Sequence, residues 1–233
     1  MRRRIYLMRH AEVAYFEPDG RPVRPEAVSL TGEGKKQARA MHEALAGLRF
    51  DRSITSDLER TLETARIVAP GVEPEAWPDL RELGAGRLGD IPDEDVEQAF
   101  AGVFRDVVPE ETRFLGGETI GSLFDRVLPA LERLLADESW DVLLAVLHGG
   151  VNRAILSFAL TGERTFLGNF EQAPACVNIL DAGAGHWVVR AVNVTPYDLA
   201  HVSGRETTME QLYGEYLPYR KARRRGRRRA GPA

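Results

Sequence analysis

The run VLLAVL at residues 142–147 is the feature that most constrains the fold, because it is nearly all apolar. A strand without a polar face has to be covered on both sides, as the strands of parallel sheets are. A helical pattern follows this run, and helical patterns also follow two other strand-like runs. The pairs of run and helical pattern are 4–8 and 30–48, 52–56 and 56–69, and 142–147 and 149–160. This alternation predicts an α/β fold with a mostly parallel central sheet and helices on both of its faces.

The helical patterns carry local signals of where they begin and where they are interrupted. Thr31 can cap the first, and Ser56 with Glu59 forms a capping box at the start of the second. Pro129 lies inside a further helical pattern at 118–136, where it predicts a kink or a break. Near the end of the chain, the segments ACVNILD and HWVVRAV, joined by AGAG, predict an antiparallel hairpin.

Two segments differ from this regular pattern. Residues 84–118 hold several glycines and prolines around one predicted helix near 93–107, and we interpret them as an inserted lid subdomain of a domain that spans 1–219. Residues 220–233 contain eight basic and no acidic residues, whereas the net charge of the whole chain is only −4. Such a tail could bind nucleic acid or an anionic surface, but we favour a disordered, solvated tail without a specific partner.

The composition excludes several classes of protein. The chain of 233 residues has one cysteine, Cys176, so it has neither an internal disulfide framework nor a cysteine-based metal cluster. No two histidines lie at i, i+4 on one helix, and we expect no metal and no cofactor. No apolar run approaches the length that spans a bilayer, and the basic start lacks the features of a signal peptide. These observations predict a cytoplasmic protein.

Basic and titratable residues gather where the predicted strands end. Arg9 and His10 follow the first strand, Arg60 lies in the first turn after the second, and His148 and Gly149 follow the third. Ligands of open α/β sheets bind at the carboxyl ends of the strands, where helix N-termini also favour anions. Cations gathered in one place repel one another unless an anion lies between them. A phosphate group suits this arrangement, because guanidinium groups bind its oxygens in pairs.

These residue types can carry out phosphoryl transfer. A neutral nitrogen of His10 can attack phosphorus in line and form a phosphohistidine, while the arginines and a protonated His148 neutralise the phosphate oxygens. The leaving oxygen needs a proton. Glu82, in the segment DLRELGAG, can supply it, because a neighbouring phosphate dianion favours the protonated carboxyl. Glu12 is a rival candidate for this acid.

The motifs that carry these residues resemble those of the histidine phosphatase superfamily, which is phosphoglycerate mutase-like. Six motifs occur in the order typical of that family: LMRHAE (7–12), LTGEGKKQA (30–38), SDLERTLETA (56–65), LRELGAG (80–86), GGET (116–119) and VLHGGVNRAIL (146–156). The resemblance covers residues 4 to about 195. It implies His10 as the nucleophile, a phosphate pocket of Arg9, Arg60 and His148, Glu82 as general acid and base, and catalysis without a metal.

The chain also departs from the family pattern. Ala11 replaces the usual glycine after the first histidine, and Val13 replaces a usual hydroxyl residue. The segment 13–29 is long, and we interpret it as a substrate-specificity loop. The residues predicted to bind the substrate are Arg9, Glu12, Arg21, Arg24, Arg60, His148 and Gly149. The two loop arginines could equally be solvated charges, and Asn152 and Arg153 are assigned no role.

We therefore expect a metal-independent phosphatase that hydrolyses small phosphate monoesters through a phosphohistidine. One alternative is a phosphotransferase of the phosphoglycerate mutase type. This alternative is less favoured, because a mutase has to shield its phosphohistidine from water and the chain shows no clear device for that. Another is a catalytically weak module that binds phosphate, which Ala11 and Val13 keep open.

Overall fold

A six-stranded sheet forms the centre of the molecule in the computed structural model, which describes residues 2–183, 185–202 and 204–229. Its strand order is β3-β2-β5-β1-β7-β8. The strands are β1 (Arg3–Arg9), β2 (Arg52–Thr55), β3 (Glu75–Ala76), β5 (Val142–Leu147), β7 (Val177–Gly183) and β8 (His186–Val194). Neighbouring strands from β3 to β1 are parallel, whereas β7 and β8 form an antiparallel hairpin that pairs with β1. The predicted mostly parallel sheet and the late hairpin are both confirmed.

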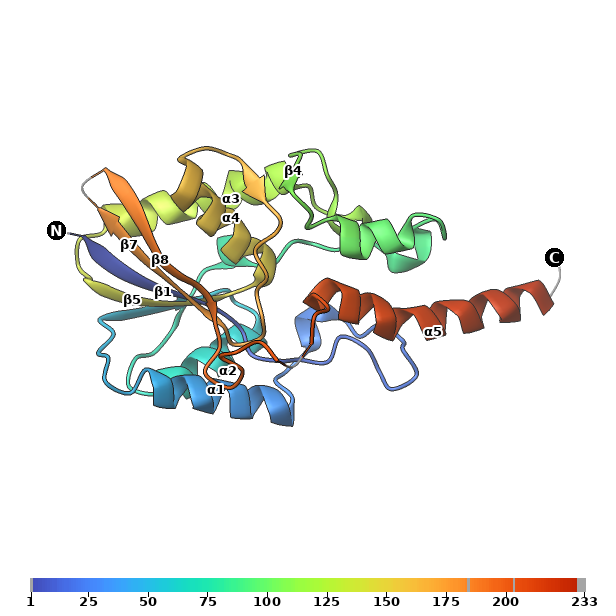
Figure 1. The fold of residues 1–233 in the computed structure, drawn as a ribbon, viewed down its shortest axis with the longest axis horizontal. Coiled ribbons are helices and arrows are strands. Elements are labelled where there is room, and N and C mark those ends of the chain that lie inside the picture. Colours follow the sequence, from blue (N-terminus) through green and yellow to red (C-terminus); the bar gives the residue numbers. More distant parts are fainter. Residues whose placement is uncertain (1, 184, 203, 230–233) are drawn as a thin grey trace.

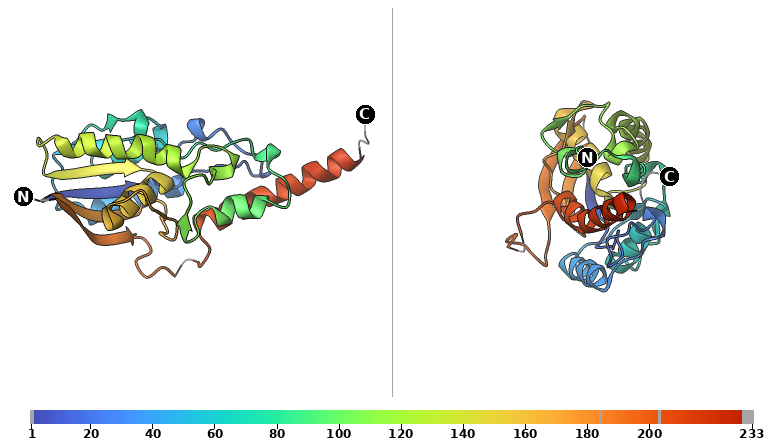
Figure 2. Two further views of the ribbon diagram at one scale, coloured as in Figure 1. Left: turned by 90° about the horizontal axis from the view of Figure 1, so that it is seen from above. Right: turned by 90° about the vertical axis from the view of Figure 1, so that its right-hand side faces the viewer.

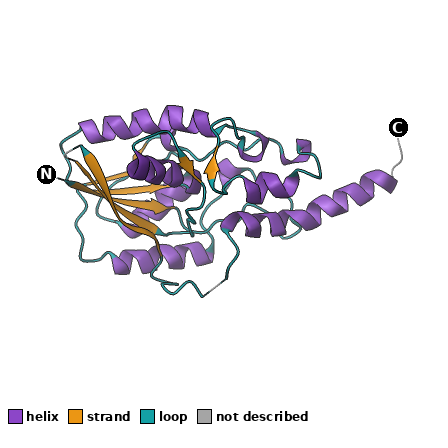
Figure 3. Ribbon diagram, turned by 45° about the horizontal axis from the view of Figure 1, so that its top comes forward, coloured by secondary structure: helices purple, strands orange, loops and turns teal. Residues whose placement is uncertain are grey.

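Helices cover both faces of this sheet (Figure 1). They are α1 (Gly32–Ala44) and α2 (Glu59–Val68) on one face, and α3 (Ile120–Ala136) and α4 (Gly149–Thr161) on the other. Alternate residues of β1 serve the two faces: Ile5 and Leu7 belong to the core under α3 and α4, and Tyr6 and Met8 to the core under α1 and α2. Figure 3 shows the strands as one layer between these helices. A strand that packs on both faces has to be apolar throughout, which explains the run in β5.

Most helix signals have the predicted outcome, with two corrections. Thr31 caps α1, since its hydroxyl accepts a hydrogen bond from the Gly34 amide at 2.9 Å. The capping box of Ser56 and Glu59 is wrong: α2 begins only at Glu59, after Leu58 in extended backbone, so Ser56 is too far from the first turn. The break predicted at Pro129 is wrong, since α3 continues to Ala136, while the alternative of a kink there stays a prediction. The proline is exposed, so water can satisfy the carbonyl that it leaves unbonded.

The insertion at 84–118 contains less helix than the sequence predicts. Its helical part is a π-helix, Gln98–Gly102, with short 3₁₀ turns at Leu88–Asp90 and Phe114–Gly116 on either side. Strand β4 (Val107–Val108) pairs with β6 (Phe166–Leu167) and attaches the insertion to the region after α4. Two further 3₁₀ turns lie outside it, at Pro25–Ala27 and Pro78–Leu80. The role of this segment as a lid stays a prediction.

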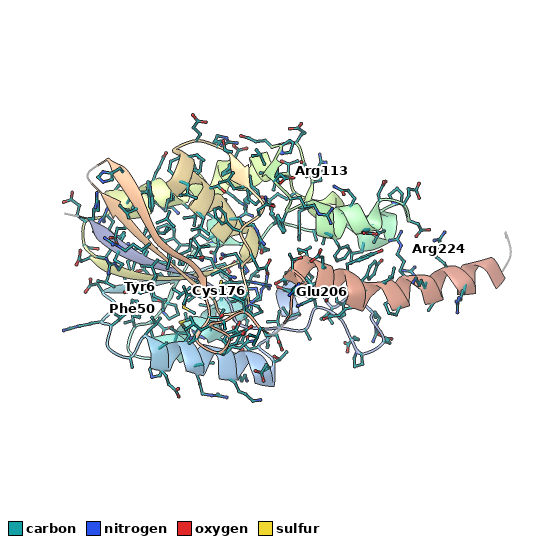
Figure 4. All side chains as sticks on the ribbon, in the orientation of Figure 1. Tyr6, Phe50, Arg113, Cys176, Glu206 and Arg224 are labelled. Atoms are coloured by element: carbon teal, nitrogen blue, oxygen red, sulfur yellow. The ribbon has the colours of Figure 1, made fainter. Side chains whose placement is uncertain are left out.

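A long C-terminal helix, α5 (Thr208–Arg229), runs beside the insertion and then projects beyond the body (Figures 1 and 2). It corrects the prediction of a disordered tail, because residues 220–229 continue the helix. Two ion pairs to the insertion support it there: Arg220 and Arg224 both contact Asp93, at 2.7 Å. Figure 4 shows Arg224 on the part of α5 that lies away from the sheet. Residues 230–233 of the predicted tail lie outside the described residues.

Candidate active site

The register of two central strands brings the predicted histidines together. Strands β1 and β5 are parallel neighbours, and Arg9 is the register partner of Leu147. The residue that follows each strand is a histidine, so His10 and His148 come to lie side by side. Their ring centroids are 5.3 Å apart, and the His10 amide donates to the Leu147 carbonyl at 2.9 Å. Both side chains are buried, with exposed fractions of 2% and 0%.

Two buried arginines flank the rings. Arg9 Nη1 donates to the Gln172 carbonyl at 2.5 Å and to Thr208 Oγ1 at 3.0 Å, and Arg60 Nη1 donates to the Pro25 carbonyl at 2.6 Å. Within the described residues, Arg9 Nε, Arg60 Nε and His148 Nδ1 are buried polar atoms without a hydrogen-bond partner. A buried guanidinium without an acceptor is costly. An anion with several oxygens could accept from this set of nitrogens, and phosphate is such an anion.

The hydrogen bonds of His10 determine which of its nitrogens can react. Nδ1 lies 2.8 Å from the carbonyl oxygen of Ala11, which can only accept, so Nδ1 carries the hydrogen and Nε2 the lone pair. Burial lowers the pKa of His10 well below its usual value, and the positive charges of Arg60 and Arg9 lower it further. The ring is therefore neutral at neutral pH, with a nucleophilic nitrogen at Nε2.

The second histidine is held by a residue that the sequence did not indicate. His148 Nε2 lies 2.8 Å from Ser56 Oγ, whose oxygen accepts from the Leu58 amide. When the Ser56 hydroxyl donates to Nε2, the hydrogen of a neutral ring is on Nδ1, the nitrogen without a partner within the described residues. Burial and the charge of Arg60 lower the pKa of His148 well below its usual value. Desolvation and three positive neighbours, Arg60, Arg9 and Arg126, disfavour the charged ring, so the predicted protonation of His148 would have to come from the negative charge of a bound phosphate and stays a prediction.

Glu82 lies in the loop after the 3₁₀ turn Pro78–Leu80, and its carboxylate contacts the first turn of α4 at Gly150, two residues after His148. Both of its carboxylate oxygens accept from the Gly150 amide at 3.1 Å, and its carbonyl accepts from Arg126 Nη2 at 3.2 Å. A Cβ atom at position 150 would be only 2.6 Å from Glu82 Oε1, so the glycine permits this close approach. Gly149 is the first residue of α4, and a Cβ built on it would lie within 4 Å of both Glu82 and Arg9.

The rival acid points elsewhere. Glu12 Oε1 accepts from the Thr31 hydroxyl at 2.7 Å, and the Glu12 carbonyl accepts from the Thr31 amide at 3.0 Å. These contacts tie Glu12 to the start of α1 rather than to the histidines. The geometry therefore favours Glu82 over Glu12 as the proton donor.

Among the remaining residues, the two loop arginines are exposed, whereas two residues of α4 are buried near the site. Arg21 and Arg24 are exposed, and neither is among the charges that act on His10, so their role in substrate binding stays a prediction. Asn152 and Arg153, to which the sequence assigns no role, are both buried. Arg153 Nη1 donates to the Gly149 carbonyl at 3.2 Å, and burial lowers its pKa to about 10. The spacing of four residues from Gly149 places Arg153 on the same side of α4 and could have indicated it.

Among the described residues, no three His, Cys, Asp or Glu side chains come together in a way that could hold a metal ion. In the same part of the chain, no helix has both the length and the apolar character needed to cross a bilayer.

The lowered pKa of His148 predicts a pH dependence of stability. In the unfolded chain a histidine takes up a proton near pH 6.5, while the folded ring stays neutral there, so protons favour unfolding. The free energy of unfolding should fall below pH 6.5 by at most about 1.4 kcal/mol per pH unit for each such histidine. Urea unfolding at pH 7.5, 6.5 and 5.5 measures this slope. The variant His148→Asn should show a shallower slope; equal slopes in both proteins would contradict the assignment.

The fold and this site together define a class of protein. The family model of the histidine phosphatase superfamily (branch 1) matches residues 5–195, and the chain belongs to this family. It is 30% identical to an adenosylcobalamin/alpha-ribazole phosphatase of Salmonella typhimurium. The match extends over 203 residues and covers 82% of this chain and 96% of that protein. An Arabidopsis thaliana protein described as "Probable 2-carboxy-D-arabinitol-1-phosphatase" is 26% identical over 204 residues, 83% of this chain but only 42% of that longer relative.

Solved structures give the same fold. A mycobacterial glucosyl-3-phosphoglycerate phosphatase superposes with a TM-score of 0.65 at 22% sequence identity, over 83% of this chain and 99% of that one. The α/β architecture predicted from the sequence is thus shown both by the topology of the sheet and by this likeness.

Proposed function

We propose that the protein hydrolyses phosphate monoesters through a covalent phosphohistidine at Nε2 of His10. One observation carries this proposal: a neutral histidine nitrogen lies beside buried donors of Arg9, Arg60 and His148 that lack partners within the described residues. Such a set matches the needs of a phosphoryl group, whose oxygens accept hydrogen bonds while phosphorus accepts the nucleophile.

The reaction has two displacements. In the first, the lone pair of His10 Nε2 forms a bond to phosphorus as the bond from phosphorus to the ester oxygen breaks. Glu82, in its protonated form, gives the leaving oxygen its proton. In the second, Glu82 takes a proton from water as the water oxygen bonds to phosphorus and the P–N bond breaks. Arg9, Arg60 and His148 donate to the equatorial oxygens in both steps, where the negative charge is spread.

Hydrolysis is favoured over transfer by two relatives that match more than four fifths of this chain, whereas a Salmonella paratyphi A protein named a probable phosphoglycerate mutase matches 62% of it at 33% identity. The Salmonella typhimurium protein that resembles this chain is named an adenosylcobalamin/alpha-ribazole phosphatase, and the Arabidopsis thaliana protein a probable 2-carboxy-D-arabinitol-1-phosphatase. This likeness supports small, sugar-like phosphate esters as the substrate class of this chain.

A panel of esters tests the proposal. We expect release of inorganic phosphate from p-nitrophenyl phosphate and from at least one of alpha-ribazole 5′-phosphate, 2-carboxy-D-arabinitol 1-phosphate and 3-phosphoglycerate. Because no step needs a metal, 10 mM EDTA should change these rates by less than about twofold. Free phosphate is measured colorimetrically, and organic products by ³¹P NMR. Loss of activity in EDTA, or an isomeric ester as the main product, would refute metal-independent hydrolysis.

A further inference from the structure

A phenol lies over the reactive nitrogen of His10. The hydroxyl oxygen of Tyr15 is 3.4 Å from His10 Nε2, the nitrogen that Ala11 leaves free to react. A phosphorus atom attacked by Nε2 would have to approach this same nitrogen, so its oxygens would come within reach of the tyrosine hydroxyl. Val13, two residues earlier, packs in the apolar core under α1 and α2 and offers no hydroxyl.

The surroundings of Tyr15 keep its hydroxyl protonated. Burial raises the pKa of Tyr15, and the charges of Arg60 and Arg9 offset this only in part. The negative charge of Glu82 raises the pKa of Tyr15 further. The phenol is thus close enough to Arg9, Arg60 and Glu82, the proposed phosphate-binding and acid residues, for their charges to change its pKa. A neutral O–H among cations can donate to an anion without repelling it.

Arg60 holds the backbone around Tyr15 in place. Its guanidinium carbon lies 5.8 Å from the centroid of the Tyr15 ring, and its Nη1 donates to the Pro25 carbonyl of the same segment. The Tyr15 carbonyl accepts from the Val23 amide at 2.9 Å, which closes the segment on itself. Arg60, which is proposed to bind phosphate, therefore also fixes the position of the Tyr15 ring.

The next residue connects this segment to the C-terminal helix. Phe16, which follows Tyr15, packs against the apolar cluster formed by the insertion and α5. Its ring stacks on Tyr216 of α5 at 5.8 Å, and Tyr216 stacks on Phe100 of the insertion at 5.7 Å. Gly20 lies against the backbone of the same helix, since a Cβ there would be 2.9 Å from the Glu215 carbonyl. Helix α5 thus supports the loop that carries Tyr15.

We propose that Tyr15 is a catalytic residue that donates its hydroxyl hydrogen to an oxygen of the transferring phosphoryl group, and that α5 positions it through Phe16. The proposal rests on the function proposed above and adds a residue to it. As Nε2 bonds to phosphorus and the ester bond breaks, the hydroxyl turns from the nitrogen to the phosphoryl oxygen. Tyr15 keeps its proton throughout, so the balance of the reaction is unchanged.

The substitution Tyr15→Phe removes the hydroxyl and keeps the ring. We expect kcat for p-nitrophenyl phosphate to fall by roughly 10- to 100-fold, with the burst of phosphoenzyme slowed to the same extent, because a donor to the transition state is lost. Tyr213→Phe is the matched control: Tyr213 contacts the same aromatic cluster at Phe100, and its variant should stay within about twofold of wild type. Wild-type or faster turnover in Tyr15→Phe would overturn the proposal, and faster turnover would show that the hydroxyl competes with the substrate.

A double-mutant cycle tests the part of α5. If Phe16 acts by positioning Tyr15, Phe16→Ala should lower kcat in the wild-type background and have little further effect in Tyr15→Phe. If Phe16→Ala lowered kcat equally in both backgrounds, the proposal that α5 positions Tyr15 through Phe16 would be wrong. Failure of this proposal can be distinguished from failure of the proposed function, because the proposed function is tested on the wild-type protein. If the wild type releases phosphate without a metal but Tyr15→Phe has the same kcat as the wild type, only the role of Tyr15 is wrong.

Discussion

Replacing His10 by alanine is expected to lower the hydrolysis of every active ester by at least about 10⁴-fold. Phosphate monoesters are among the slowest compounds to hydrolyse without a catalyst, so loss of the covalent step leaves only what the positive pocket can do. The pocket itself should survive, since Arg9 and Arg60 are held by backbone carbonyls and not by His10. Steady-state rates and the affinity for inorganic phosphate, by isothermal calorimetry, measure the two effects separately.

His42→Ala is the control for this variant. His42 contacts the Val68 carbonyl at the C-terminal end of α2, whereas Arg60 lies at the N-terminal end of that helix, so the change is remote from the pocket. It should keep wild-type turnover. A rate for His10→Ala within tenfold of wild type would show that another group attacks phosphorus.

Replacing Glu82 by glutamine should lower turnover by an amount that depends on the leaving group. An amide cannot supply a proton, so esters of alkyl alcohols should lose about 10²- to 10³-fold in kcat. Nitrophenolate leaves without a proton, and p-nitrophenyl phosphate should lose less than about tenfold. The glutamine oxygen can still accept from the Gly150 amide, so the local structure should persist. The measurement is kcat for both kinds of ester in the wild type and the variant.

Glu12→Gln is the matched control, because it makes the same change in the rival carboxyl. Its amide oxygen can still accept from the Thr31 hydroxyl, and we expect little change with either kind of ester. If Glu12→Gln instead showed the large, leaving-group-dependent loss, the roles of the two carboxyls would have to be exchanged.

The sequence predicts those parts of the site that depend on neighbours along the chain. The apolar run in β5 required a sheet covered on both faces, and the register of β1 with β5 then brought His10 and His148 together. Arg60 follows from its place in the first turn of a helix after a strand. These predictions use only periodicity and the rule that parallel strands end at one edge.

Contacts that depend on side-chain placement could not be predicted in this way. Ser56 looked like a helix cap, but its hydroxyl reaches His148, which is 92 residues later in the chain. The sequence places Tyr15 in the predicted specificity loop at 13–29 but gives it no role, because nothing in a loop sequence shows which side chain turns inward. The order of α5 depends on aromatic packing against Phe16 and Phe100 and on ion pairs to Asp93, none of which its own basic sequence reveals.

Identification of the phosphorylated atom tests the central claim most directly. Rapid acid-free quenching of the enzyme with a ³²P-labelled ester, followed by peptide mapping and comparison with phosphohistidine standards, shows both the residue and the nitrogen. Because Nδ1 of His10 is bound to the Ala11 carbonyl, the label should be on His10 as the Nε2-phosphohistidine isomer. A label on Nδ1 or on a different residue, or turnover without any labelled enzyme, would contradict the mechanism.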